Sequence, residues 1–247
     1  MKLVVCAVMS TIVLVHGAFE GGWCFGRVAG QLRSAGHEVH TPTLTGCGER
    51  FHLLSRDVDL DLHIEDVCAV LRYERLWEVV LVGHSYGGTV VTGVADRQRD
   101  RIKRIVYLDA SAPVNGQSAS GAFAEGTASK LEEMSKSEGW LLPPLPVSAV
   151  GVTDPHDVEL LEQLRHPHPM RTLVEPLRLD HGDTKLPRSY VVCTKHEGLV
   201  ATFGVDPLAP FAERARREEW DMHEVDAGHD VMLIDPSATT AIISAYA

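Results

Sequence analysis

A serine flanked by two glycines stands where a strand pattern passes into a helix pattern. Residues 83–87 read Gly-His-Ser-Tyr-Gly, which matches the G-x-S-x-G sequence of a nucleophile on a sharp turn. The Val/Leu-rich residues 78–82 indicate the strand, and the apolar residues 89–95 indicate the helix. Glycine at both flanks removes Cβ atoms that would clash in so tight a turn. We therefore predict that Ser85 is an activated nucleophile.

A serine nucleophile needs a general base, and His229 fits that role best among thirteen histidines. Residues 227–230, Ala-Gly-His-Asp, follow the last strand pattern and precede the last helix pattern. The histidine also comes last in the chain, as is typical of proteins with this serine turn. We expect His84 to support the structure and Asp230 to cap the final helical region.

Two carboxylates are candidates for the acid that orients His229 and stabilises its protonated form. Asp109 follows the strand pattern at 102–108 directly, whereas Glu197 follows the strand pattern at 189–194 among polar residues. The direct exit from a buried strand favours Asp109. Glu197, which we expect in an exposed loop, remains the alternative.

Two backbone amides are predicted to bind the oxyanion that develops when a serine attacks a carbonyl group. One is the amide of Tyr86, directly after the nucleophile. The other is the amide of Ala18, in the glycine-rich loop that follows the first strand pattern, with Phe19 as the adjacent alternative. His16 is expected to hold this loop through hydrogen bonds of its ring.

Strand and helix patterns alternate along the chain, which predicts a mostly parallel central sheet with helices on both faces. One helix is expected after the first glycine-rich loop, ending near residues 35–36. Strands are expected at 11–15, 38–43, 78–82, 102–108, 189–194 and 222–225, and helices at 62–72, 89–95, 208–219 and from 236 onward. The whole chain, 1–247, is interpreted as one α/β domain.

Residues 111–187 break this alternation with Ser/Gly-rich and Pro-rich pieces. We interpret this segment as a helical lid inserted between two core strands. Its apolar residues either line a substrate pocket or pack the lid onto the core; they are Trp140, Leu141, Leu142 and Leu145.

Composition excludes several classes of partner. The net charge of −11 argues against binding to nucleic acid or to an anionic membrane surface. The five cysteines are odd in number and form no C-x-x-C pair, which predicts buried thiols in a cytoplasmic protein. Cys24 is the candidate for the alternative, a reactive thiol near the pocket. The sequence allows a homodimer but does not fix the oligomeric state.

The apolar run at residues 3–15 resembles a secretory signal, but it is too short to span a membrane and leads directly into His16 and Gly17. We interpret it as ending in the first core strand. Met9 is an alternative natural start, which would make residues 1–8 an extension. The pairs His37/His40 and His166/His168 lack a converging set of carboxylates, so we expect no metal site and no cofactor.

Three segments carry a resemblance to the α/β-hydrolase superfamily. Residues 12–23, residues 82–88 and residues 228–230 resemble the plant methylesterase and hydroxynitrile lyase group. Residues 43–50 and 106–110 look closer still to bacterial esterases of that group. The resemblance covers most of the core and is weak across the lid. It implies the α/β-hydrolase fold and a cofactor-free Ser-His-acid enzyme acting on small or medium apolar carboxylic esters.

Departures from that group refine the expectation. The plant enzymes take their acid from the loop that holds Glu197 here, and usually have aspartate there, which supports Asp109 in this chain. The lyases have a threonine where Gly17 stands and a lysine where Asp230 stands, so cyanohydrin cleavage is not expected. Two alternatives remain: a lactonase, thioesterase or cyclising enzyme with the same residues, and a non-catalytic ligand-binding protein on this scaffold.

Overall fold

Six parallel strands form the central sheet of the computed structural model, which describes residues 9–123, 126, 129, 131–133, 136 and 139–247. The strand order is β2-β1-β3-β4-β7-β8. The strands are β1 (Thr11–Val15), β2 (Glu38–His40), β3 (Val79–Ser85), β4 (Ile102–Ala110), β7 (Arg188–Cys193) and β8 (Asp221–Val225). The predicted mostly parallel α/β fold is confirmed.

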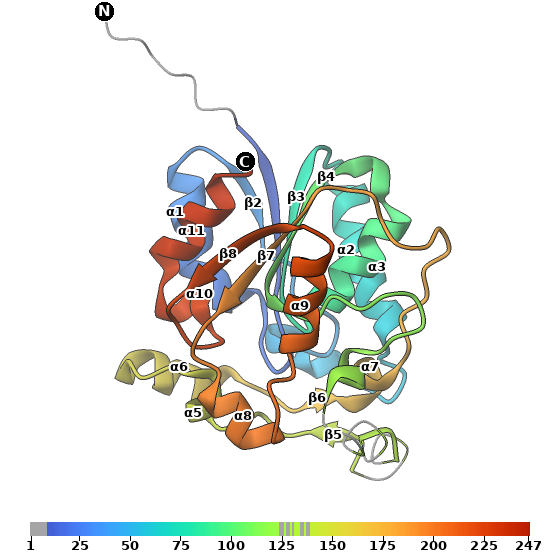
Figure 1. The fold of residues 1–247 in the computed structure, drawn as a ribbon, viewed down its shortest axis with the longest axis vertical. Coiled ribbons are helices and arrows are strands. Elements are labelled where there is room, and N and C mark those ends of the chain that lie inside the picture. The colour runs from blue at the N-terminus through green and yellow to red at the C-terminus, as the bar shows by residue number, and fades with distance from the viewer. Residues whose placement is uncertain (1–8, 124–125, 127–128, 130, 134–135, 137–138) are drawn as a thin grey trace, which may run out of the picture.

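Helices cover both faces of the sheet (Figure 1). One face packs against α1 (Gly26–Ser34) and α11 (Pro236–Ser244), with the short α10 (Val231–Ile234) beside them. The other face packs against α2 (Leu60–Tyr73), α3 (Gly87–Arg97) and α9 (Ala209–Arg217). Alternate residues of one strand serve the two layers, because successive side chains of a strand point to opposite faces. Ile12 and Leu14 lie in the first layer, and Val13 and Val15 in the second.

The segment at 111–187 connects β4 to β7, and most of its described elements lie beyond the carboxyl ends of the strands (Figure 1). Its elements are short: β5 (Leu141–Leu142), α5 (Val147–Val150), α6 (Pro155–Leu164), β6 (His168–Pro169), α7 (Met170–Val174) and one 3₁₀ turn (Ala119–Ala122). β5 and β6 pair antiparallel. The insertion point matches the sequence expectation, and the role of this segment as a lid stays a prediction.

Several boundaries differ from the sequence expectations. The second strand ends at His40 and not at Thr43, because Pro42 lacks the N–H that a ladder requires. Helix α8 (Glu197–Phe203) and helix α10 were not anticipated, because each is only four to seven residues long. The remaining short elements are 3₁₀ helices at Gly22–Phe25, Gly48–Leu53 and Arg99–Arg101.

The N-terminal run becomes β1 from Thr11 onward. Residues 1–8, on which the alternatives of a leader or an extension fall, lie outside the described residues, and so does Cys6. The four described cysteines are free and buried. Within the described ranges, no helix combines the length and the apolar character needed to cross a bilayer.

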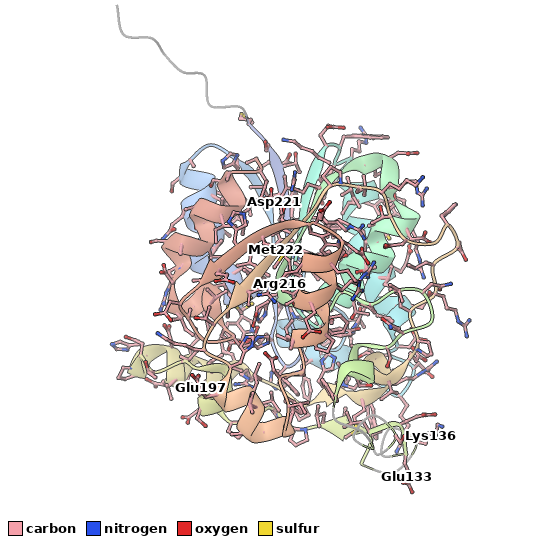
Figure 2. The ribbon with its side chains drawn as sticks, viewed as in Figure 1. Glu133, Lys136, Glu197, Arg216, Asp221 and Met222 are labelled. Carbon is pink, nitrogen blue, oxygen red and sulfur yellow. The ribbon has the colours of Figure 1, made fainter. Side chains whose placement is uncertain are left out.

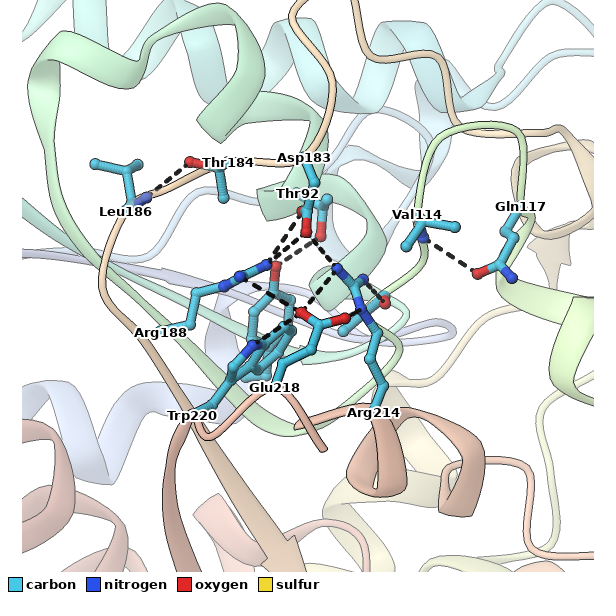
Figure 3. A network of polar contacts seen from close by, with 12 residues as sticks. Thr92, Val114, Gln117, Asp183, Thr184, Leu186, Arg188, Arg214, Glu218 and Trp220 are labelled. Atoms are coloured by element: carbon cyan, nitrogen blue, oxygen red, sulfur yellow. Dashed lines mark hydrogen bonds and ion pairs between the residues drawn. The ribbon is translucent and has the colours of Figure 1, made fainter. Parts of the chain in front are cut away.

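A buried arginine joins both ends of the 111–187 segment to α9 (Figure 3). Arg214 donates to the carbonyl oxygen of Ala112 at 2.9 Å and to the carboxylate of Asp183 at 2.6 Å. It also donates to Glu218 at 2.8 Å, one helical turn away. The ring of Trp220 lies 5.2 Å from the Arg214 guanidinium and 4.2 Å from that of Arg188. Arg214 therefore ties the residue after β4 to the loop before β7, and Arg188 shares the carboxylates of Asp183 and Glu218 with it.

The substitution Arg214→Met should lower the free energy of unfolding by about 2–3 kcal/mol, since it removes one of the two arginines that Asp183 and Glu218 share and leaves the carbonyl oxygen of Ala112 without this donor. Thermal or urea unfolding measures the change. The control is Arg216→Met on the same helix, where an exposed pair with Glu224 at 3.5 Å predicts a loss of no more than about 0.5 kcal/mol. Equal losses in the two variants would contradict the buried clamp.

Candidate active site

Ser85 is the last residue of β3 and has a backbone φ of +53°, a conformation that residues other than glycine rarely adopt. The chain passes almost at once into α3, which begins at Gly87. A Cβ atom at Gly83 would lie 2.6 Å from the carbonyl oxygen of Gly87, and one at Gly87 would lie 2.6 Å from those of Val15 and His16. The two glycines thus permit the close approach that exposes the serine at the carboxyl edge of the sheet.

His229 lies in the loop between β8 and α10 and is fixed from two sides. Its Nδ1 donates to the Oδ2 atom of Asp109 at 2.7 Å. Its backbone carbonyl accepts a hydrogen bond from the Nε2 atom of His84 at 3.0 Å. Because Nδ1 is the donor, Nε2 of His229 is the nitrogen left for proton transfer. His84 has the supporting position expected for it.

Asp109 is completely buried at the carboxyl end of β4, next to Ser85 on the neighbouring strand β3. Its φ of +46° turns the side chain toward β7 and β8, where Cys193 donates its amide to Oδ1 at 3.0 Å. Burial alone would raise the pKa of this carboxyl. Hydrogen bonds from His196 and His229 outweigh burial and hold the pKa of Asp109 well below its usual value. The carboxylate is therefore ionised at neutral pH.

Of the two carboxylates that the sequence left open, Asp109 is the one bonded to His229. Glu197 is instead the first residue of α8 and is exposed. Figure 2 shows it at the outer side of that helix. His196, next to Glu197, was not singled out by sequence reasoning, yet its Nε2 atom lies 2.8 Å from Asp109 Oδ2.

The residues of both expected oxyanion donors lie at the pocket of the nucleophile. Tyr86 follows Ser85 directly, and Ala18 lies with Ser85 and His229 around one pocket. The amide of Phe19, which has a φ of +70°, is directed at Nδ1 of His168 at 3.5 Å. Because that amide already has a partner, the geometry favours Ala18 over Phe19 as the second donor.

Buried histidines hold the two loops that carry the expected oxyanion donors, Ala18 and Tyr86. His16 accepts from the amide of Leu44 at 3.1 Å and donates to the carbonyl of Gly17 at 2.7 Å, which fits its expected structural role. His63 accepts from the hydroxyl of Tyr86 at 2.9 Å and donates to the carbonyl of Thr45 at 2.9 Å. Burial lowers the pKa of His16 to about 4 and lowers that of His63 as well. Both rings are therefore neutral and act as fixed donors and acceptors.

His168 comes from the 111–187 segment and contacts the same region. Its Nε2 donates to the hydroxyl of Thr172 at 2.8 Å, so its Nδ1 is free to accept from Phe19. Burial holds the pKa of His168 well below its usual value. No local sequence signal pointed to His63 or His168, because the partners that tie them to the site, Tyr86, Thr45 and Phe19, lie between 18 and 149 residues away.

The pocket at Ser85 is lined almost entirely by apolar side chains. Leu142 and Leu145 contribute from the segment at 111–187, as one of the two sequence interpretations required. Trp140 and Leu141 do not line it. The remaining apolar lining comes from both sides of the site, namely Ala119, Phe123, Leu173, Leu199, Phe203, Pro207, Leu208 and Phe211. No charged carboxylate, lysine or arginine faces this pocket among the lining residues.

A second pair of carboxyl groups is buried beneath His229. Glu20 and Asp230 each have a buried oxygen atom without a hydrogen-bond partner, Oε2 and Oδ2 respectively. Burial, followed by the neighbouring charge of Glu20, raises the pKa of Asp230 well above its usual value, and burial raises that of Glu20. Asp230 occupies the N-cap position of α10, but its side chain makes no capping hydrogen bond there; Asp235 caps α11 by accepting from the amide of Ala238 at 2.8 Å.

Cys24 is fully buried near this acidic pair, and burial raises the pKa of its thiol well above the usual value. Its thiolate is therefore disfavoured, which argues against the alternative of a reactive cysteine. The histidines considered for metal binding have other contacts: His166 stacks on Phe51 with ring centres 4.2 Å apart, and His40 pairs with Glu38 at 3.2 Å. The absence of a metal site stays a prediction.

Comparisons with known proteins place these features in context. The sequence model described as the Alpha/beta hydrolase family matches residues 12–242. A carbendazim hydrolyzing esterase from Nocardioides sp. (strain SG-4G) is 36% identical over 244 residues, which cover 93% of this chain and 96% of that protein. Methyl jasmonate esterase 1 from Vitis vinifera is 29% identical, over 77% of this chain and 80% of that protein.

Solved structures show the same fold. An extracellular alpha/beta-hydrolase from a Paenibacillus species superposes with a TM-score of 0.76 at 24% identity, covering 96% of this chain and 98% of that one. A methylesterase from Arabidopsis superposes with a TM-score of 0.68 at 25% identity, covering 95% and 97%.

The buried acidic pair predicts a stability that falls as pH rises. Asp230 has a raised pKa in the folded state, so above about pH 4 the unfolded chain ionises first and gains relative to the folded one. Asp230→Asn should therefore raise Tm near pH 7.5 and increase the free energy of unfolding there by about 1–2 kcal/mol. The gain should vanish near pH 4, which thermal unfolding across the pH range measures. The exposed Asp226→Asn is the control and should give no gain at any pH; a similar gain there would contradict the prediction.

Proposed function

The chain belongs to the alpha/beta hydrolase family, and we propose that it is a carboxylic ester hydrolase in which Ser85, His229 and Asp109 form the catalytic triad. The observation that carries this proposal is the hydrogen bond of 2.7 Å between His229 and the buried, ionised Asp109, beside a serine on a strained turn. That arrangement supplies a base of fixed tautomer within the same pocket as the nucleophile.

In the proposed reaction, the Oγ atom of Ser85 attacks the ester carbonyl while Nε2 of His229 takes its proton. The amides of Ala18 and Tyr86 stabilise the negative oxygen of the tetrahedral intermediate. His229 then returns the proton to the departing alcohol, and a water molecule activated by His229 hydrolyses the acyl-enzyme. Asp109 stabilises the imidazolium of His229 in both steps.

The lining of the pocket supports small or medium apolar esters as substrates. Three leucines from the inserted segment line the pocket of the nucleophile together with four phenylalanines, namely Leu142, Leu145, Leu173, Phe19, Phe123, Phe203 and Phe211. A substrate with a free carboxylate would lose its hydration there without gaining a cationic partner from the lining residues. The named relatives that hydrolyse carbendazim and methyl jasmonate are themselves esterases, which agrees with this class.

The cytoplasm remains the proposed location. Its support is the set of four described cysteines, all of them buried thiols in a chain that forms no disulfide among its described residues.

Ser85→Ala should reduce hydrolysis of p-nitrophenyl esters by about 10³-fold or more, because no other group replaces the nucleophile. Activity is followed by p-nitrophenolate release over a series of acyl lengths, and the preferred length sizes the pocket. A fluorophosphonate probe should label the wild type and not the variant. Retention of wild-type activity by Ser85→Ala would refute the proposal.

Asp109→Asn should reduce kcat by about 10³- to 10⁴-fold while leaving the protein folded, since an amide can hold His229 in the wrong tautomer. The matched control is Glu197→Gln, which removes the other candidate carboxylate from an exposed site. It should keep wild-type kcat. Steady-state kinetics of the two variants distinguish the carboxylates, and the reverse pattern would assign the acid to Glu197.

A further inference from the structure

His196 lies against the carboxylate of Asp109, the acid of the proposed triad. Its Nε2 atom is 2.8 Å from Asp109 Oδ2, and its Nδ1 atom is 2.8 Å from Asp206 Oδ2. Both nitrogens thus face a carboxylate oxygen, and a ring that donates from both nitrogens is an imidazolium. The side chain is 10% exposed, so water screens this charge only weakly.

His196 and His229 bond to the same oxygen atom of Asp109. Their ring centres are 6.5 Å apart, with the ring planes inclined at 74°. A positive charge at His196 therefore competes with His229 for the carboxylate and also repels a proton on His229. Asp109 consequently serves two histidines, one of which is placed to modulate the other.

We propose that His196, held between Asp109 and Asp206, is a positioning residue that fixes the Asp109 carboxylate and keeps a positive charge beside it, so that the acidic limit of the reaction lies at lower pH. This inference rests on the proposed triad. In this role His196 and Asp206 influence the pH range of the reaction without contacting the substrate.

The charged and titratable groups around His196 are consistent with this role. From β4 it meets Asp109, from the residues before α9 it meets Asp206, and beyond Asp109 it meets His229. On β7, burial raises the pKa of the Tyr190 hydroxyl and of the Cys193 thiol, so both are neutral. Burial alone would lower the pKa of His196, but its bonds to Asp109 and Asp206 raise it to about 10.

The remaining neighbours add little charge at this point. Arg216 of α9 lines the same small cavity but is half exposed and pairs with Glu224. Helix α5, which packs against α8, has the sequence Val-Ser-Ala-Val and no charged residue. The adjacent residues in the chain, Lys195 and Glu197, are exposed, and Lys195 pairs with Asp226 at 2.9 Å.

The sign of the effect follows from the charges. A cation beside His229 disfavours a second positive charge on that ring, so the acidic limb of activity should lie at lower pH with the cation than without it. Removal of the cation should move that limb to higher pH. Loss of packing alone would lower the activity without moving the limb.

The experiment compares the pH profile of kcat/KM for the wild type, His196→Gln and Lys195→Gln, from about pH 4 to about pH 9. Glutamine retains an amide donor for Asp109 but carries no charge. His196→Gln should move the acidic limb upward by about one pH unit. Lys195→Gln removes a cation from the next residue at an exposed site and should leave the limb in place. An unmoved limb in His196→Gln, or an equal shift in Lys195→Gln, overturns the proposal.

A measurement on the unmodified protein guards against a variant that fails to fold. The ¹⁵N chemical shifts of the imidazole nitrogens should show His196 protonated on both nitrogens at pH 8. A neutral His196 ring at pH 8 would overturn the proposal. Because this titration needs no turnover, it gives an answer even if the ester assays contradict the proposed function.

Discussion

A carboxylate that has no contact with water stays ionised only if the protein supplies the hydrogen bonds and positive charge that water would otherwise give. Asp109 is such a carboxylate, and much of the structure around the site satisfies it. Its partners come from separate parts of the chain: the amide of Cys193 at the end of β7, the ring of His196 just beyond it, and the ring of His229 beyond β8. The parallel order β3-β4-β7-β8 brings these strand ends to one edge, so the sheet topology itself makes the buried charge tolerable.

Histidine residues have three different physical roles in this structure. The burial of each ring and the groups that face it determine which role it has. His16, His63, His84 and His168 are buried without a carboxylate in hydrogen-bond contact, and burial lowers the pKa of each; that of His84 falls to about 3. These neutral rings brace loops. His196 faces two carboxylates and carries a charge. His229 faces one carboxylate and the nucleophile's pocket, which leaves it free to exchange a proton.

The core strands, the serine turn and the position of His229 could be predicted from the sequence, because each rests on a local pattern of a few residues. The choice between Asp109 and Glu197 could be argued but not closed, since both follow core strands and only the contact with His229 distinguishes them. The parts of His63, His168 and His196 could not be predicted at all. Their partners lie far away in sequence, as with His168 and Phe19, 149 residues apart, and one sequence carries no sign of such contacts. Asp230 misled for the same reason: next to a helix start it resembles a cap, but its side chain turns to Glu20 instead.

The Arg214 clamp has a consequence for how this enzyme family can diversify. Because Ala112 and Asp183 both bind the guanidinium of Arg214, the two ends of the segment between β4 and β7 are held close together. The entropy of closing a loop grows only slowly with its length, by about 0.6 kcal/mol for each doubling. Insertions, deletions or replacement of this segment therefore cost the core little, while they rebuild the wall of the pocket contributed by Leu142 and Leu145. The segment at 111–187 can therefore be replaced during evolution, which changes the substrate preference while the proposed catalytic residues stay the same.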